Sequence, residues 1–519
     1  MDTDQLPAAG GAPRAAAETG AARTAGGPGA GTGLGWGWVL LGVAGSCLLA
    51  LSTPPLVTNV DGPAVTWWYR VLLSPGTGTT GNVIGAYLGL AAVLVAWLGV
   101  GRRVARSRQP PWRLWALAAA WGIPLLVAPP LFSRDAYSYL AQATLTHLGL
   151  SPFTHGPSAL GAHGYGAMVA AVSPVWRSSL SPYGPLFLWW TGLLAGLTGH
   201  GIVAGVVLLR LPEVVGLVLV AVGLPRLAVA LGADPARALW LGLASPLALF
   251  ELVGASHNDA LMVGLLVCAL ALAARRRPLP AVAVATLGAL VKLPAAAAVV
   301  LIALVWVRQQ PTAAARVRAA LASAGVAGAL AAAVSVATGL GWGWLSPAVL
   351  GTPAGGSIEI TPATAIGDSL ARLAGLLGVG LSPATSHHLV EAVLAVVAAA
   401  VCILVVLRTR PANLVASVAV VLAAAVVAGP ALWPWYLTWS LVLLAARPGP
   451  QRSPVLPVVS VLACLVLAPT GRILVPGSDA VLVTAGWAVV AVAVAVCWRR
   501  GWRPGLWPSA RPERTETPV

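Results

Sequence analysis

Long apolar segments, separated by short connections, run through most of the chain. Because an α-helix rises about 1.5 Å per residue, roughly 20 apolar residues are enough to cross the hydrocarbon core of a bilayer. The pattern predicts an all-α bundle of roughly 13–14 transmembrane or half-spanning helices. These are expected near residues 35–54, 82–100, 114–131, 186–199, 201–222, 239–255, 260–275, 281–307, 317–339, 387–407, 412–430, 437–446, 454–470 and 480–498.

The two ends of the chain differ from this pattern. Residues 1–34 are rich in Ala, Gly, Pro and Thr without periodicity, which predicts a disordered tail, and residues 500–519 form a second polar tail. The first apolar run begins only near Trp36 with no cleavage-like site after it, so a secretory signal peptide is not expected. The predicted organisation is one membrane domain over residues 35–499.

Composition argues against a water-soluble protein. Hydrophobic residues make up 58% of the 519 residues and charged residues only 9%, whereas soluble domains carry about 25% charged residues. A net charge of +16 would otherwise suggest nucleic-acid binding, but the arginines gather between apolar segments, where membrane topology explains them. The sequence therefore predicts a polytopic membrane protein with membrane lipid around it and no nucleic-acid partner.

Arginine placement predicts the orientation. Connections rich in arginine stay in the cytoplasm, which assigns both tails to that side together with residues 101–113, 275–277, 308–318, 408–410 and 499–500. Alternation then places outside the segments 55–81, 132–185, 256–259, 340–386 and 431–436. The segment 132–185 is thus the first large outer loop.

Two apolar runs do not fit a simple count of crossings. The run 281–307 begins and ends on the arginine-rich side, so a hairpin of short helices is expected, with its turn at Lys292 and Pro294. The run 186–222 must make one net crossing although it holds two apolar parts, so one part is expected to be re-entrant or interfacial. Broken helices are tolerated in membranes where they line a cavity, which is where a site is expected.

The outer loop begins with a carboxylate at the predicted membrane boundary. In LLVAPPLFSRDAYSY, Asp135 follows the expected helix end near Leu131. A carboxylate there can face an aqueous cleft and approach a lipid-linked phosphate, or it can cap a surface helix over Ala136–Leu148. The residues alone leave both interpretations open.

Other ionisable residues fall on or near the same side. Such groups are costly within a membrane and indicate function by default. Arg210 and Glu213 share a helix face, so they either form a structural pair or serve a site. In ASHNDAL, Asp259 either caps a helix or joins His257 in a site. Lys292 is the only lysine of an arginine-rich chain, which favours a compact point charge for an anion.

Together these residues suit sugar transfer from a lipid phosphate. Cations can neutralise the departing phosphate, and a carboxylate can accept the proton of an acceptor hydroxyl. Nucleotide-sugar chemistry would need a cytoplasmic acidic metal site, which the sequence lacks, and the five cysteines show no metal-ligand spacing. Aromatic residues of WPWYLTW form an interfacial belt or stack on a sugar.

Seven short motifs occur in a specific order: PPLFSRDAYSYLAQ, GLSPFTHGP, SPYGPL, RLP, SHNDAL, VKLP and WPWYLTW. This order, over about residues 35–500, resembles the actinobacterial polyprenol-phosphate-mannose-dependent α-1,6-mannosyltransferases, integral membrane glycosyltransferases of the GT-C class. The resemblance implies transfer of mannose from a polyprenyl-phosphate sugar donor to an α-1,6-mannan lipid acceptor, the backbone of lipomannan and lipoarabinomannan. The active site is expected on the outer face of the plasma membrane.

The resemblance also implies roles for residues. GT-C enzymes carry their catalytic carboxylate in the first large outer loop, which corresponds to Asp135. The donor phosphate is assigned to Arg134, Arg210 and Lys292, and the sugar and acceptor pocket to Tyr137, His257, Asn258, Asp259, Trp433 and Tyr436. Many GT-C enzymes have two acids in that loop, but Asp135 is the only acid of residues 132–185. A single-base mechanism without cofactor or divalent metal is therefore expected. It is expected to be inverting, because the β-linked lipid donor that the resemblance implies would give an α-linked product in one displacement.

Two alternatives stay open. Broken helices with intramembrane charges also suit a lipid-linked sugar transporter or flippase, although the two halves of the chain show no convincing duplication. A GT-C enzyme for another sugar or acceptor would carry the same residues.

Overall fold

The computed structural model describes residues 33–53, 79–350, 361–429, 431–466, 485 and 488. All regular elements in this part of the chain are helices. Five are long and apolar enough to cross a membrane: Thr80–Arg106, Ile202–Ala230, Ala313–Ala337, Pro383–Arg408 and Pro411–Ala428. The bent pair Ala248–Gly254 and Asp259–Ala274 provides a sixth if it counts as one span, and further apolar helices have 10–17 residues. The protein is an all-α polytopic membrane protein, as predicted.

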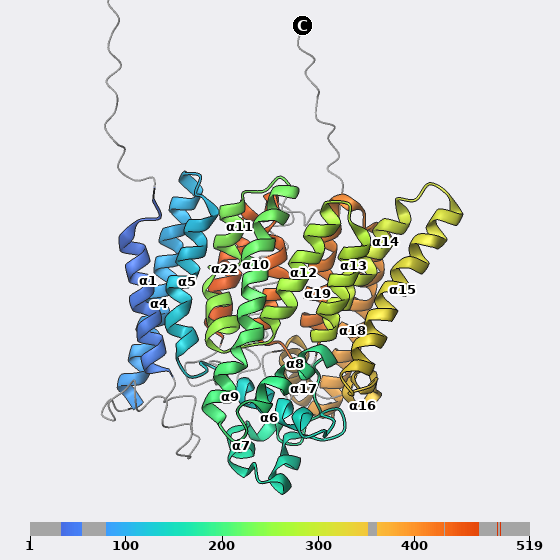
Figure 1. Cartoon of the computed structure of the whole chain (residues 1–519). Coiled ribbons are helices and arrows are strands. Elements are labelled where there is room, and N and C mark those ends of the chain that lie inside the picture. The colour runs from blue at the N-terminus through green and yellow to red at the C-terminus, as the bar shows by residue number, and fades with distance from the viewer. Residues whose placement is uncertain are drawn as a thin grey trace, which may run out of the picture. The chain divides into compact units, whose positions relative to one another are not determined.

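Helices of different lengths pack side by side in one bundle within residues 33–466 (Figure 1). They are α1 (Trp36–Ser52), α4 (Thr79–Arg106), α5 (Pro111–Val127), α10 (Arg210–Ala230), α12 (Asp259–Ala274), α13 (Pro278–Val291), α14 (Ala296–Arg308), α15 (Ala313–Ala337), α18 (Pro383–Arg408), α19 (Leu414–Ala428), α20 (Leu437–Ala445) and α22 (Val455–Cys464). The predicted segment 480–498 and both predicted tails lie almost wholly outside the described residues.

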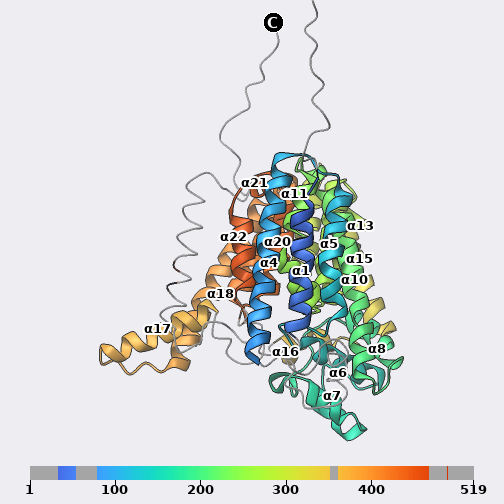
Figure 2. The ribbon, with the colours of Figure 1, turned by 90° about the vertical axis from the view of Figure 1, so that its left-hand side faces the viewer.

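Short helices gather at the two ends of the bundle. One end, called here the loop end, holds α6 (Asp135–His147), α7 (Gly166–Ala171), α8 (Pro185–Gly196), α9 (Ile202–Leu208), α16 (Pro347–Leu350) and α17 (Pro362–Leu376) (Figures 1 and 2). The opposite end holds α11 (Pro235–Leu241) and α21 (Pro448–Gln451) (Figure 2). Single turns and a π-helix complete the chain: η1 (Pro157–His163), η2 (Pro174–Trp176), η3 (Ala248–Gly254), η4 (Leu293–Ala295), η5 (Gly343–Leu345), η6 (Pro411–Asn413) and η7 (Pro434–Tyr436).

The connections that carry arginines lie at one end of the bundle, and the predicted outer loop lies at the other. The connections α4–α5, α12–α13, α14–α15 and α18–α19 all lie at the end opposite α6 and α7, called here the arginine-rich end (Figure 1). These are the connections predicted to share one side of the membrane. Their common position satisfies the topology that the arginine pattern requires.

The structure explains the two apolar runs that do not fit a simple count of membrane crossings. The run 281–307 is a hairpin, in which α13 ends at Val291 and α14 begins at Ala296, with Lys292 in extended backbone between them. In the run 186–222, α8 has only 12 residues, while α9 and α10 form one span that continues past the predicted end to Ala230. The hairpin returns the chain to the arginine-rich end and leaves Lys292 at the loop end.

Close packing of α10 against α12 positions the site. A Cβ added to Gly264 would lie 2.4 Å from the carbonyl oxygen of Gly216. Small residues allow two membrane helices to approach in this way. The contact holds the start of α10, with Arg210 and Glu213, near the residues that precede α12.

Candidate functional site

Two loop-end segments meet where the site forms, residues 131–135 and 254–259. The N–H of Leu131 donates a hydrogen bond to the Gly254 carbonyl oxygen at 2.9 Å. Phe132 (φ 58°) and Ser256 (φ 64°) adopt left-handed backbone, which is uncommon for residues with a side chain. Between η3 and α12 the chain bends by 118°. The π-helix and this bend direct residues 251–259 toward the start of α6, as expected of π-helical turns at functional sites.

Asp135 lies at the mouth of this junction. It is the first residue of α6, whose N-cap is Arg134, so the helix-cap interpretation is wrong. Its Oδ2 lies 3.7 Å from Nε2 of His257, and its side chain keeps 14% of its surface exposed while that of His257 keeps 0%. A partly exposed carboxylate backed by a buried imidazole can receive a proton from an entering molecule.

Burial also changes the pKa of Asp135. Loss of solvent raises the pKa of Asp135 to about 6, against the opposing effects of the Lys292 cation and of hydrogen bonds from Ser133 and Trp176. The carboxyl group therefore titrates close to neutral pH, where a general base works best.

The tautomer of His257 follows from its contacts. Its Nδ1 lies 2.8 Å from the main-chain carbonyl oxygen of Glu251, which can only accept, so Nδ1 carries the proton. Neutral Nε2 is then an acceptor that faces Asp135. The ring stacks on Trp435 with centroids 3.8 Å apart, which fixes its plane. Glu251 was not among the predicted site residues, although its Oε2 lies 3.7 Å from Nδ1. Its signal in the sequence is an acid inside the apolar run 239–255.

Asp259 and Lys292 form a buried ion pair. The Lys292 ammonium donates to both carboxylate oxygens of Asp259 at 2.9 Å, and Trp439 Nε1 donates to Oδ1 at 2.5 Å. Asp259 is the first residue of α12 and Asn258 its N-cap, so the cap interpretation is wrong for Asp259 too. The lysine predicted to face an anion already binds a carboxylate of the protein. Trp439 was not anticipated.

Aromatic rings surround the ammonium. Lys292 Nζ lies 4.7 Å from the ring centroid of Tyr436, 5.4 Å from that of Trp439 and 5.7 Å from that of Tyr183. Trp433, which was predicted in the pocket, stacks on Trp435 at 4.8 Å. Cation–π contacts stabilise a charge that burial would otherwise penalise.

The other predicted residues occupy the surroundings of this cluster. Arg134 donates three hydrogen bonds to the carbonyl oxygens of Ala170 and Ala171 at the end of α7, where a cation suits the helix dipole. Arg210 is buried and donates to the Ala128 carbonyl oxygen at 2.7 Å. Glu213 accepts a short hydrogen bond from Ser256. Both predicted arginines thus bind the main chain.

Tyr137 and Asn258 are buried beside the cluster. Tyr137 interacts electrostatically with Arg134 and Arg210. The side-chain amide of Asn258 has no hydrogen-bond partner within the described part of the chain. An unsatisfied buried amide is unusual in folded proteins and offers a donor and an acceptor to a ligand.

A small cavity lies beside Leu293, the residue that follows Lys292. It has about 160 Å³, and its lining includes Tyr183, Gly184, Leu293 and Trp344. Residues of the SPYGPL motif thus form part of the wall of this cavity. Among the described residues, no group of three or more His, Cys, Asp or Glu is arranged to hold a metal ion.

The fold and this cluster define a helical integral membrane protein with a carboxylate–imidazole and carboxylate–ammonium site at one end of its bundle. The chain belongs to the α-(1→6)-mannopyranosyltransferase family: the family model described as its N-terminal domain matches residues 39–308, more than half of the chain. A model described as the MptB C-terminal domain matches residues 363–497. All residues of the cluster on α6, α12 and α13 fall within the first match.

The individual proteins to which the chain is similar carry the name of the same family. The chain is 40% identical over 200 residues to α-(1→6)-mannopyranosyltransferase A of Mycobacterium tuberculosis, covering 38% of each chain. It is 34% identical over 200 residues to the A enzyme of Corynebacterium glutamicum (37% of this chain, 40% of the relative). It is 31% identical over 249 residues to the B enzyme of the same organism (46% and 40%). These matches span about two fifths of the relatives' length. No solved structure matches the chain.

Proposed function

We propose that this protein is an inverting mannosyltransferase that moves mannose from polyprenyl-phosphate-mannose to the 6-hydroxyl of an α-1,6-mannan on the outer face of the plasma membrane. The observation that carries the proposal is Asp135, a partly exposed carboxylate with its pKa raised to about 6, in a chain of the α-(1→6)-mannopyranosyltransferase family. The donor, acceptor and orientation come from the sequence resemblance and the arginine pattern.

In the proposed reaction Asp135 is the general base. The acceptor hydroxyl loses its proton to Asp135 as its oxygen bonds to C1 of mannose, and the bond from C1 to the phosphate oxygen breaks. Polyprenyl phosphate leaves with the electron pair. One displacement inverts a β-linked donor to an α-linked product. The carboxyl group keeps 14% of its side-chain surface exposed, so it can then release the proton to solvent.

The cations divide into two roles. Lys292 is the proposed partner of the donor phosphate, because its ammonium lies at the loop end beside the Asp135 cluster and a small cavity. Arg134 and Arg210 instead hold main-chain segments around the cluster, so we assign them to positioning. Asn258, Tyr137, Trp433 and Tyr436 are the proposed walls of the sugar and acceptor pocket.

We further propose that no divalent metal is needed. Asp259, the second acid of the cluster, is occupied by Lys292 and Trp439 and so is poorly placed to share a cation with Asp135. Transfer that persists in excess EDTA would support this mechanism, and loss of transfer that Mg²⁺ or Mn²⁺ restores would contradict it.

The deciding experiment is a cell-free assay with polyprenyl-phosphate-mannose and short α-1,6-mannosides, reading product length and linkage. Asp135→Asn should lower kcat by about 10²–10⁴-fold, the usual contribution of a general base. Asp368→Asn is the matched control, because Asp368 on α17 pairs with His387 on α18, away from the cluster. Near-normal transfer by Asp135→Asn would remove the base assignment, and purified protein that moves labelled lipid without transferring sugar would favour a flippase.

A further inference from the structure

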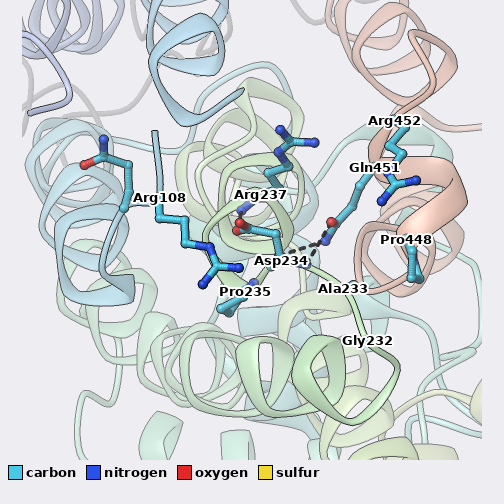
Figure 3. A pocket seen from close by; sticks show the side chains of 10 residues that line it. Arg108, Gly232, Ala233, Asp234, Pro235, Arg237, Pro448, Gln451 and Arg452 are labelled. Carbon is cyan, nitrogen blue, oxygen red and sulfur yellow. Dashed lines mark hydrogen bonds between the residues drawn. The ribbon is translucent and has the colours of Figure 1, made fainter. Parts of the chain in front are cut away.

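The arginine-rich end carries a separate cavity. It has about 500 Å³ and is lined by the α4–α5 connection, α11 and α21 (Figure 3). Its charged lining residues are three arginines and one acid: Arg108, Arg237, Arg452 and Asp234. The Asp135 cluster lies at the opposite end of the bundle (Figure 1). The proposed transfer reaction uses no residue of this cavity.

The single acid does not neutralise the arginines. Asp234 is the N-cap of α11, and its Oδ1 accepts hydrogen bonds from the main-chain N–H groups of Ala236 (2.8 Å) and Arg237 (2.9 Å). Within the described residues, no ion pair joins Asp234 to an arginine. The cavity therefore keeps an excess of positive charge.

Hydrogen bonds connect the elements that form the walls. Gln451 accepts from the Asp234 N–H at 3.0 Å and donates to the carbonyl oxygens of Asp234 and Ala445, both at 2.8 Å, which joins α11 to α21 (Figure 3). Arg237 donates to the Ala105 carbonyl oxygen at 3.0 Å, which joins α11 to the end of α4. Its buried Nε has no hydrogen-bond partner in the described structure. A guanidinium held in place with an unused N–H is suited to an anion.

Membrane topology alone would place arginines at this end without forming a site. A second cavity at the same end allows the number of lining arginines to be compared. It has about 670 Å³ and is lined by mostly apolar residues with one arginine, Arg276. Charge is therefore concentrated in the smaller cavity. That cavity lies just beyond Arg106, the end of a membrane span. Trp112, 58% exposed after the same connection, marks the interfacial level where lipid head groups lie.

We propose that this cavity binds the phosphate of an anionic lipid head group, through Arg108, Arg237 and Arg452. Basic pockets between membrane helices recognise phosphate-bearing head groups in this way. Occupation would hold α11, α21 and the α4–α5 connection together at the end of the bundle that does not carry out the transfer.

The test uses the full chain in a neutral detergent, titrated with phosphatidylglycerol or with phosphatidylcholine. Bound lipid is counted by native mass spectrometry and stability is followed by Tm. Arg108→Gln/Arg452→Gln should raise the half-saturating phosphatidylglycerol concentration about 100-fold, about tenfold for each lost charge-assisted contact. Both side chains are exposed, so folding should be kept. Arg275→Gln/Arg318→Gln removes the same charge at the same end outside the cavity, and should leave binding unchanged.

The outcomes separate the alternatives. Equal loss in both double variants, or no preference for phosphatidylglycerol over phosphatidylcholine, would overturn the proposal and leave topology as the explanation of the arginines. A soluble arm uses glycerol 3-phosphate. If glycerol 3-phosphate displaces phosphatidylglycerol from the wild-type protein and binds as tightly as the lipid does, the cavity is a phosphate site for a soluble ester, and the lipid proposal is overturned. If only phosphatidylglycerol binds, the lipid head group is supported as the source of the phosphate.

Discussion

For single residues, the raised pKa of Asp135 determines the direction in which kcat/KM changes with pH. A general base must be ionised, and the pKa of this carboxyl is about 6 because burial disfavours its charged form. We expect kcat/KM to be level at pH 7–8, half-maximal at about pH 6, and to fall about tenfold per pH unit below that. The measurement is a pH–rate profile with a short α-1,6-mannoside.

His257 provides the control for this profile. Its ring lies 3.7 Å from Asp135 and helps to bury the carboxyl group, and burial is the main cause of the raised pKa of Asp135. His257→Asn can still donate to the Glu251 carbonyl, but its smaller side chain admits water beside Asp135, so the midpoint should move to lower pH. A profile with no acidic limb near pH 6 in the wild type would contradict the assignment of Asp135.

The ion pair of Lys292 and Asp259 makes a second prediction at this scale. Lys292→Ala leaves the fully buried Asp259 without its cation, which should lower the free energy of unfolding by about 3–5 kcal/mol. Lys292→Arg should recover part of the loss, since the charge is kept. Thermal denaturation of the purified variants would measure the loss in Lys292→Ala and the recovery in Lys292→Arg as changes in Tm.

A double variant separates stability from donor binding. Lys292→Met/Asp259→Asn removes both charges while Trp439 can still donate to position 259. Its Tm should recover relative to Lys292→Ala. If Lys292 also binds the donor phosphate, the KM for polyprenyl-phosphate-mannose stays raised about tenfold or more. A wild-type KM in the double variant would show that Lys292 has only a structural role.

At the scale of elements, the junction of α8 with α13 depends on one glycine. The N–H of Gly184 donates to the Val291 carbonyl oxygen at 2.9 Å. A Cβ at Gly184 would lie 2.0 Å from the Leu290 carbonyl oxygen, which is main chain and cannot swing away. This contact fixes Tyr183 beside Lys292 at the end of α13.

Gly184→Ala should therefore push α8 away from the end of α13. The expected cost is about 1–3 kcal/mol of stability, as for other overpacked sites, with a loss of transfer activity in the fraction that folds. Gly161→Ala is the matched control, because a Cβ there meets nothing within 4 Å. Equal Tm values for the two variants would show that the junction yields without cost.

At the scale of the whole molecule, the separation of the arginine-rich end from the loop end predicts the orientation in the membrane. Cysteines placed at His163 in η1 and at Ala314 in α15 lie on exposed surface at opposite ends. They are best introduced in a Cys47→Ala background, because Cys47 is the exposed cysteine among the described ones. An impermeant thiol reagent on intact cells should label position 163 and reach position 314 only after permeabilisation. The reverse pattern would place the Asp135 cluster in the cytoplasm.

Local properties of the chain were enough to predict the class of the protein. Apolar runs, composition and arginine placement are local properties of the chain, and they predicted the all-α membrane bundle, the helical hairpin at Lys292 and the gathering of the arginine-rich connections. Local motifs also singled out Asp135, His257, Asp259, Lys292 and Tyr436, which the structure brings into one cluster. Helix bounds were less accurate, as at Ala230, because apolar character continues through a helix without marking its end.

Which groups face one another in the site depends on how the helices pack in three dimensions. Trp439 meets Asp259 across 180 residues of chain, and Lys292 meets it across 33, so no local pattern could pair them. The helix-cap roles considered for Asp135 and Asp259 failed because each lies one position inside its helix, a difference that the backbone bend before α12 and the turn at Phe132 impose. Arg134 and Arg210 bind carbonyl oxygens that the packing of α7 and α5 exposes. A buried charge takes the partner that three-dimensional packing supplies, and that choice follows from the fold rather than from spacing along the chain.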